Sequence, residues 1–227
     1  MGSFVDVDCA RELRDVPDSE GLLHVVGVTG DGRLWYTVRD PALIHGYGWT
    51  PFRDGELSKG GTGPFLRAAV ATARQAGRVE VVVAGVTADG GLWATTRKSG
   101  SEFHPFAGVA PPAGDDPTVR AVALADAAGS AVTIHLAAVS GDGHLWHAVG
   151  RPGQWLSLTD VEKTLAGNRP GDLTDVACAG NGDLDMVAVA GDGHVWRTTR
   201  APSNRWTPFT DPEATDVGSF TRIGVAQ

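Results

Sequence analysis

Four apolar segments of eight residues recur along the chain, and each leads directly into the same short turn. The segments are LLHVVGVT (22–29), EVVVAGVT (80–87), TIHLAAVS (133–140) and DLDMVAVA (183–190). They are rich in valine and apolar on both alternating faces, which is typical of strands that are buried on both sides. The pattern therefore predicts four buried strands.

The turn after each segment contains Asp-Gly. Its four copies are GDGRLW (30–35), ADGGLW (88–93), GDGHLW (141–146) and GDGHVW (191–196). Because Asp-Gly supplies the φ > 0 positions of a tight hairpin, an antiparallel partner is predicted to follow each buried strand. The tryptophans that end the copies are 58, 53 and 50 residues apart, a spacing typical of one propeller blade.

Two further elements complete each repeat. An aromatic segment follows the hairpin, and its frequent proline suits an edge strand; the copies are GWTPF (48–52), EFHPF (102–106), QWLSL (154–158) and RWTPF (205–209). Another strand precedes each buried segment, as SFVDVDCA (3–10), PFLRAAVA (64–71), TVRAVALA (118–125) and DLTDVACA (172–179). Four strands per repeat, with no helical pattern, predict an all-β fold: a β-propeller with four recognisable four-stranded blades.

We place the blades of this single domain (1–227) at residues 3–56, 64–108, 117–160 and 171–212. A fifth copy of the first strand, SFTRIGVAQ (219–227), follows them, and we expect a closing strand at 218–227. This spare C-terminal strand could complete a blade across the seam of the ring. It could also pair with a second chain and form a homo-oligomer, because an unpaired strand edge promotes association.

The charge and hydropathy of the sequence mainly exclude certain partners and a membrane-spanning segment. Nucleic acids and anionic membranes require a basic patch, which 19 Lys and Arg against 27 Asp and Glu do not visibly form, so we expect neither as a partner. No apolar run approaches a membrane span, and the start MGSFVDVDCARELRD has acidic residues where a secretion signal is apolar. We therefore expect no membrane insertion, and a protein that is cytoplasmic or released without a visible signal peptide.

The combined pattern resembles a known family. An apolar strand, a G-D-G-x-L-W hairpin, an arginine a few residues later and a W-x-P-F outer strand are similar to the repeats of bacterial fucose-binding propeller lectins, and more distantly to tectonin and tachylectin-like propellers. The resemblance covers nearly the whole chain. It implies sugar sites between neighbouring blades, although those lectins typically have more blades than the four recognisable here.

Three sets of repeated residues are candidates for ligand binding. A sugar site needs an aromatic face and a few fixed polar groups. The candidate residues are the outer aromatics Trp49, Trp155 and Trp206, the polar residues His24, His135 and Asp185 on the buried strands, and Arg39, Arg97 and Arg200 after the hairpin tryptophans. Each set also has a structural alternative. The outer aromatics could pack at the edge of a blade, the polar residues could form hydrogen bonds with the next blade's backbone, and the arginines could pair with acids of their own blade.

Catalysis is weakly indicated, since the sequence contains no recognised catalytic signature and repeated residues favour repeated binding. We therefore expect no catalytic residues, no metal and no cofactor, although His144, His147 and His194 could meet on one rim of the ring. Our leading hypothesis is a lectin-like propeller with several weak sites for fucose-like or other small sugars. A protein-interaction scaffold is the alternative, and an enzyme for a small molecule is a third.

Overall fold

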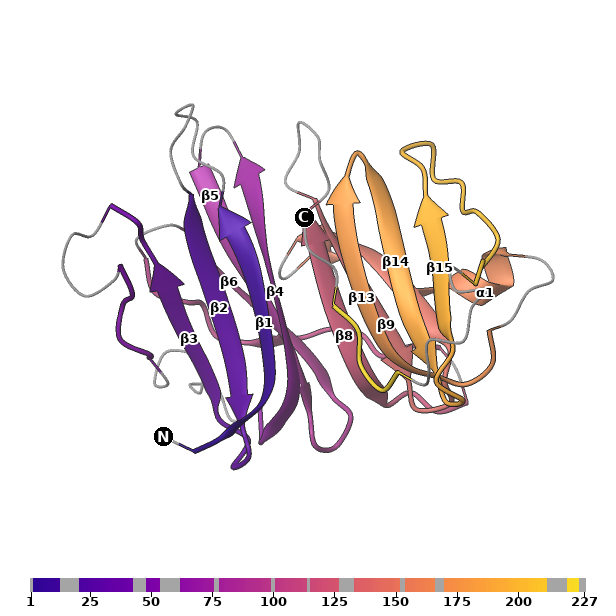
Figure 1. The fold of residues 1–227 in the computed structure, drawn as a ribbon, viewed down its shortest axis with the longest axis horizontal. Helices are drawn as coiled ribbons and strands as arrows, with labels where there is room; N and C mark the ends of the chain where they lie inside the picture. Colours follow the sequence, from indigo (N-terminus) through magenta and orange to yellow (C-terminus); the bar gives the residue numbers. More distant parts are fainter. Residues whose placement is uncertain are drawn as a thin grey trace.

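The structure is a computed structural model, and its strands form four antiparallel sheets that stand side by side (Figure 1). It describes residues 2–12, 21–42, 48–53, 62–75, 78–98, 101–113, 115–126, 133–151, 154–165, 170–211 and 220–224. The prediction of an all-β propeller is confirmed. In the described part of the chain, no helix is long and apolar enough to span a membrane.

Each sheet follows the predicted order of strands. Blade 1 contains β1 (Phe4–Glu12), β2 (Leu22–Thr29) and β3 (Leu34–Arg39), and blade 2 contains β4 (Phe65–Gln75), β5 (Arg78–Thr87), β6 (Leu92–Lys98) and β7 (Ala107–Gly108). Blade 3 contains β8 (Val119–Asp126), β9 (Ile134–Ser140), β10 (Leu145–Arg151), β11 (Gln154–Trp155) and β12 (Thr159–Asp160), followed by the short helix α1 (Val161–Thr164). Blade 4 contains β13 (Leu173–Asn181), β14 (Asp183–Ala190) and β15 (Val195–Arg200).

The Asp-Gly turns form the predicted hairpins. Their glycines have φ between 79° and 88°, a conformation that favours glycine, and the backbone N–H of each donates to the carbonyl three residues earlier at 2.8–2.9 Å. In the first three turns a Thr or Ser hydroxyl at the end of the buried strand also donates to the turn aspartate. The turn therefore explains the aspartates without any ligand.

The outer elements are shorter than the sequence predicted. Within the described residues, those of blade 1 pair with β3 only through the single bridges Tyr36–Arg53 and Arg39–Trp49, and those of blades 2 and 3 pair only as strands of two residues. Proline cannot donate to a strand ladder, which favours interrupted pairing in GWTPF, EFHPF and RWTPF, but QWLSL, which has no proline, is equally short.

The hydrophobic core lies between neighbouring sheets. Separate buried clusters join blades 1 and 2, blades 2 and 3, and blades 3 and 4. The hairpin tryptophans contribute to them: Trp146 is 3% exposed, and Trp93 and Trp196 pack against the cluster shared with the preceding blade. The side chain of a hairpin tryptophan therefore faces the preceding blade.

The C-terminal segment 220–224 lies beside β13, in the position that β4 has beside β1 (Figure 1). Ile223 N–H donates to Asp175 Oδ2 at 3.1 Å, as Ala68 N–H donates to Asp6 Oδ2 at 2.8 Å. Arg222 reaches blade 1, where its Nη1 lies 2.9 Å from the carbonyl of Val5. The segment thus links blades 4 and 1.

The predicted closing strand at 218–227 is not seen as a strand in residues 220–224, and its other residues lie outside the described part of the chain. The reason is that a first strand forms its ladder with the second strand of its own blade. The described residues supply no second strand for this position. Association with a second chain through this segment remains a prediction.

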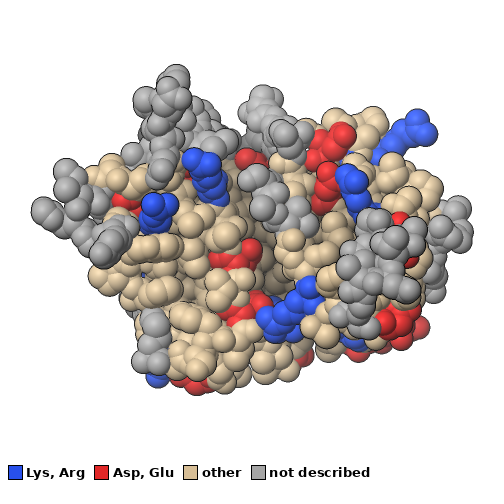
Figure 2. All heavy atoms as spheres, viewed as in Figure 1, with Lys and Arg blue, Asp and Glu red and all other residues tan. Residues whose placement is uncertain are grey.

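On the face seen in Figure 2, the described acidic and basic side chains are interspersed.

Candidate functional site

A pocket of about 410 Å³ lies between blades 3 and 4. Strands β10 and β12 and helix α1 provide one wall, and β15 with the turn that follows it provides the other. Its lining residues are His147, Thr159, Thr164, Arg200, Asn204, Arg205 and Trp206. Two of the nine predicted ligand-binding residues, Arg200 and Trp206, are therefore brought together here.

The alternation of side chains along a strand explains this convergence. Trp146 faces blade 2, so the next residue, His147, points to the opposite side and faces blade 4. Trp196 faces blade 3, and Arg200, four residues later, points the same way. Each pocket of this kind therefore combines the residue after one hairpin tryptophan with the arginine of the following blade.

His147, which lines the pocket, is paired with a second buried histidine, His135, which is not part of the lining. His135 Nδ1 lies 2.9 Å from His147 Nε2, and the two rings stack with centroids 5.2 Å apart. Burial lowers the pKa of His135 to about 4, with a further contribution from the Arg200 charge, and burial together with His135 and Arg200 lowers the pKa of His147 to about 3. Both imidazoles are therefore neutral at pH 7, one donating the shared hydrogen bond and the other accepting it.

An aromatic ring and a guanidinium stand at the front. The ring of Trp206 meets His147 edge to face at 5.2 Å, and Trp206 also packs against the core cluster between the two blades. Arg200 is held by Asn204, whose Oδ1 accepts from Arg200 Nη2 at 2.5 Å. A tight turn positions Asn204, which has φ of 65° and donates its backbone N–H to the carbonyl of Ala201 at 2.9 Å.

The equivalent position between blades 1 and 2 is filled by the protein's own side chains. The guanidinium of Arg97 lies 4.6 Å from the ring centre of Tyr36 and 5.2 Å from that of Phe103, and the two rings meet edge to face. Behind them, His24 lies between the Tyr36 hydroxyl, 2.5 Å from Nδ1, and Glu12, 3.0 Å from Nε2. Two predicted ligand-binding residues, His24 and Arg97, therefore lie together between blades 1 and 2, but they contact the protein's own aromatic rings.

The position between blades 2 and 3 is apolar. Val82 and Ala94 take the places of the two histidines, and Trp155 packs against the cluster that contains them. The buried Nε1 of Trp155 has no hydrogen-bond partner among the described residues. This position offers an aromatic ring and little that could recognise a hydroxyl group.

The remaining candidates lie outside these positions. Asp185 pairs within its own blade, 2.7 Å from Arg197 Nη2, and also accepts from the Thr199 hydroxyl. Trp49 is 45% exposed, and its backbone bridges to Arg39 within blade 1. Within the described residues, the three polar residues on the buried strands form hydrogen bonds with side chains of their own blade and not with the backbone of the next blade.

Sequence reasoning missed most of the pocket. The sequence predicted for His147 only that it could meet His144 and His194 on one rim of the ring, and it gave no signal for Thr159, Thr164, Asn204 or Arg205. One signal was available in the residue directly after each hairpin tryptophan, which is Tyr36, Ala94, His147 or Arg197. Its chemistry changes between blades, whereas the residue before it is always tryptophan and the residue after it is threonine in three of the four copies.

Comparison with solved structures shows which proteins share this fold. No family model and no curated protein matches the sequence. Among solved structures, the Aleuria aurantia lectin in complex with Fucalpha1-6GlcNAc matches with a TM-score of 0.63 at 15% identity, over 96% of this chain and 65% of that one. AofleA from Arthrobotrys oligospora matches with a TM-score of 0.65 at 11% identity, over 96% and 60%.

The BP39L lectin from Burkholderia pseudomallei matches with a TM-score of 0.62 at 18% identity, over 89% of this chain and 54% of that one. The chain thus spans between about half and two thirds of the length of these structures. The expected resemblance to fucose-binding propeller lectins is confirmed at the level of the fold.

Proposed function

We propose that this protein binds carbohydrate and that the pocket between blades 3 and 4 is its principal site. The observation that carries the proposal is the convergence there of an aromatic ring, a guanidinium and threonine hydroxyls. The volume of about 410 Å³ lies within the roughly 300–1,000 Å³ range of small-molecule sites. Trp206 can contact the C–H face of a pyranose, and Arg200 can donate to two neighbouring hydroxyls.

The neutral histidine pair suits an uncharged ligand. His147 lines the pocket without adding a positive charge at pH 7, so Arg200 and Arg205 are the cations that the described lining provides. A sugar hydroxyl can both donate and accept, which matches a wall of imidazole, hydroxyl and amide groups. The structural neighbours described as fucoside complexes support a fucose-like or other small neutral sugar.

The three inter-blade positions are unequal, so we propose one principal site per chain. A second site between blades 1 and 2 would require Arg97 to leave the rings of Tyr36 and Phe103. A third between blades 2 and 3 would lack polar groups at Val82 and Ala94. Strong multivalent binding would then depend on association of several chains.

The test is a glycan-array screen at neutral pH, followed by calorimetric titration of the sugar it identifies. Trp206→Ala removes the aromatic contact and Arg200→Ala removes charged donors, so each should weaken binding by roughly tenfold or more. Trp49→Ala is the matched control, because Trp49 occupies the same repeat position in blade 1, away from the pocket. Unchanged affinity in both pocket variants, with folding intact, would exclude this site.

A well-folded protein that binds no glycan on the array would contradict the proposal as a whole. The interaction-scaffold alternative would then become the leading hypothesis.

A further inference from the structure

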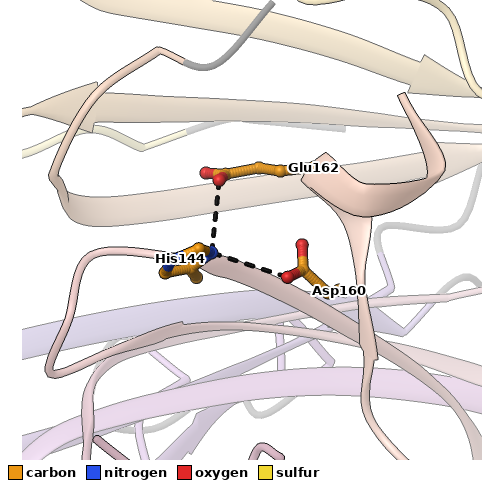
Figure 3. Close-up of side chains that lie close together, drawn as sticks. All are labelled: His144, Asp160 and Glu162. Atoms are coloured by element: carbon orange, nitrogen blue, oxygen red, sulfur yellow. Dashed lines mark ion pairs between the residues drawn. The ribbon is translucent and has the colours of Figure 1, made fainter. Parts of the chain in front are cut away.

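A second group of ionisable side chains lies on blade 3, outside the lining of the pocket. His144 follows the Asp-Gly turn, Asp160 ends β12 and Glu162 lies in α1 (Figure 3). His144 Nδ1 lies 3.5 Å from Asp160 Oδ2 and 3.3 Å from Glu162 Oε2, and all three candidate ligand atoms fall within 4.8 Å of one another. We call this group the His144 cluster.

The two carboxylates are unusually well buried. The side chains of Asp160 and Glu162 are 5% and 4% exposed, whereas that of His144 is 22% exposed. Asp160 Oδ1 accepts the backbone N–H of Lys163, but Asp160 Oδ2 is buried, accepts no hydrogen bond from the described residues and points towards His144. Buried charge is costly unless it is paired or coordinates a metal, so this oxygen indicates a cation at the cluster.

The ion pair of Asp160 with Lys163 compensates the buried charge of Asp160 only in part. Lys163 Nζ lies 3.5 Å from Asp160 Oδ2, but the lysine side chain is 73% exposed, where an ion pair contributes little. A divalent cation between the three side chains would place positive charge next to Asp160 Oδ2.

The distances between His144 Nδ1 and the two carboxylate oxygens also fit a shared metal ion better than direct hydrogen bonds. Charge-assisted N–H···O hydrogen bonds are about 2.7–2.9 Å long, shorter than the 3.3 Å and 3.5 Å found here. Zinc bonds to histidine nitrogen and carboxylate oxygen are about 2.0–2.2 Å, so two ligands of a tetrahedral zinc are roughly 3.3–3.5 Å apart. The separations of His144 Nδ1 from the two carboxylates thus match those between zinc ligands, and the two carboxylates lie within 4.8 Å of each other.

We propose that His144, Asp160 and Glu162 bind a zinc-class divalent ion. Histidine nitrogen and carboxylate oxygen are both zinc ligands, three protein ligands leave a fourth position for water, and the part-exposed His144 gives access from solvent. Calcium is a poorer match, because it takes six to eight oxygen ligands. The ion would fasten α1 to the hairpin between β9 and β10.

This proposal does not depend on sugar binding, but the two sites are neighbours in the chain. Thr159 precedes Asp160, Thr164 follows Glu162 by two residues, and both threonines line the pocket between blades 3 and 4. Fixing Asp160 and Glu162 would therefore also fix one wall of that pocket.

The prediction that His144, His147 and His194 meet on one rim is not what the structure shows. His194 Nδ1 lies 3.9 Å from Asp211 Oδ2, and the histidine in the cluster is His144 alone.

The experiment uses tag-free, chelator-treated protein titrated with zinc chloride, with bound metal and calorimetric stoichiometry measured together. We expect one zinc per chain that is lost, or weakened by roughly a hundredfold or more, in His144→Ala, Asp160→Asn and Glu162→Gln. Asp160→Asn keeps an oxygen that can cap α1, so it separates metal binding from helix capping. His104→Ala, which alters an exposed histidine on blade 2, is the control and should bind zinc as the unchanged protein does.

Two further measurements distinguish a site from non-specific binding. At zinc concentrations about a hundredfold above the dissociation constant, the melting temperature should rise by roughly 5–10 °C in the unchanged protein and not in Glu162→Gln. Cobalt(II) should give the intense ligand-field absorption of a four-coordinate site. No saturable zinc binding, or binding that survives all three ligand substitutions, would overturn the proposal.

Discussion

The buried pair His135 and His147 should make the protein lose stability in mild acid. The perturbation is a change from pH 7 to pH 5, compared between the unchanged protein and the double variant His135→Val with His147→Ala. These substitutions install the residues that blade 2 already has at the same positions, Val82 and Ala94. The variant therefore removes both titrating groups while keeping side chains that this fold accommodates between blades.

The magnitude follows from the pKa values. In the folded protein the pKa is about 4 for His135 and about 3 for His147, against 6.5 for an ordinary histidine. Between pH 6.5 and these lower values the unfolded chain binds more protons than the folded one, so stability falls as the pH falls. At pH 5 each histidine lowers the free energy of unfolding by about 2 kcal/mol relative to pH 7, and the pair by up to about 4 kcal/mol.

The assay is urea-induced unfolding at pH 7, 6 and 5, followed by tryptophan fluorescence. Substitution will change stability at pH 7 through lost packing and a lost hydrogen bond, so the informative quantity is the change with pH. Between pH 7 and pH 5, the fall in the free energy of unfolding should be smaller in the double variant than in the unchanged protein, by up to about 4 kcal/mol. Parallel curves for the two proteins would refute the reasoning, because every other titrating group is common to both.

Two further predictions concern stability. Burial raises the pKa of Asp8 from 3.8 to about 6, so its ionisation lowers stability as the pH rises from about 4 through 6; Asp8→Asn should gain roughly 2 kcal/mol relative to the unchanged protein between pH 4 and pH 8, measured by urea unfolding, and a constant difference would contradict this. Gly143 has φ of 81° and an added Cβ would lie 2.7 Å from Asp172 Cα, whereas Gly171 has φ of 84° and open space around it. Gly143→Ala should therefore cost at least about 1 kcal/mol more than Gly171→Ala, and equal melting temperatures would show that the contact is relieved.

The sequence was sufficient to predict the repeated backbone. Asp-Gly turns, valine-rich strands and the spacing of Trp35, Trp93, Trp146 and Trp196 depend on local chemistry, and the hairpins form where they were predicted. The length of the outer strands was less predictable. Prolines marked them as edge elements, but the loss of continuous pairing depends on how each segment approaches the neighbouring strand.

Contacts between blades could be anticipated only in part. The arginine and the outer aromatic were recognised as candidates because they repeat, and Arg200 and Trp206 do line one pocket. Their counterparts Arg97 and Phe103 instead contact Tyr36, because the residue after the hairpin tryptophan is aromatic there. The His144 cluster was not predicted, since Asp160 and Glu162 reach His144 through a short helix that carries no repeat signal.

The position between blades 2 and 3 shows why a repeated fold need not give repeated sites. Val82 and Ala94 remove the polar groups, and Gly150 stands where blades 1, 2 and 4 have an arginine. A Cβ at Gly150 would lie 2.8 Å from the carbonyl oxygen of Gln154 and 2.8 Å from Trp155 Cα, both backbone atoms. Arginine cannot enter this position without moving β11. Histidines introduced at Val82 and Ala94 should therefore not create a sugar site there. The number of sites is set by the side chains at each interface between blades.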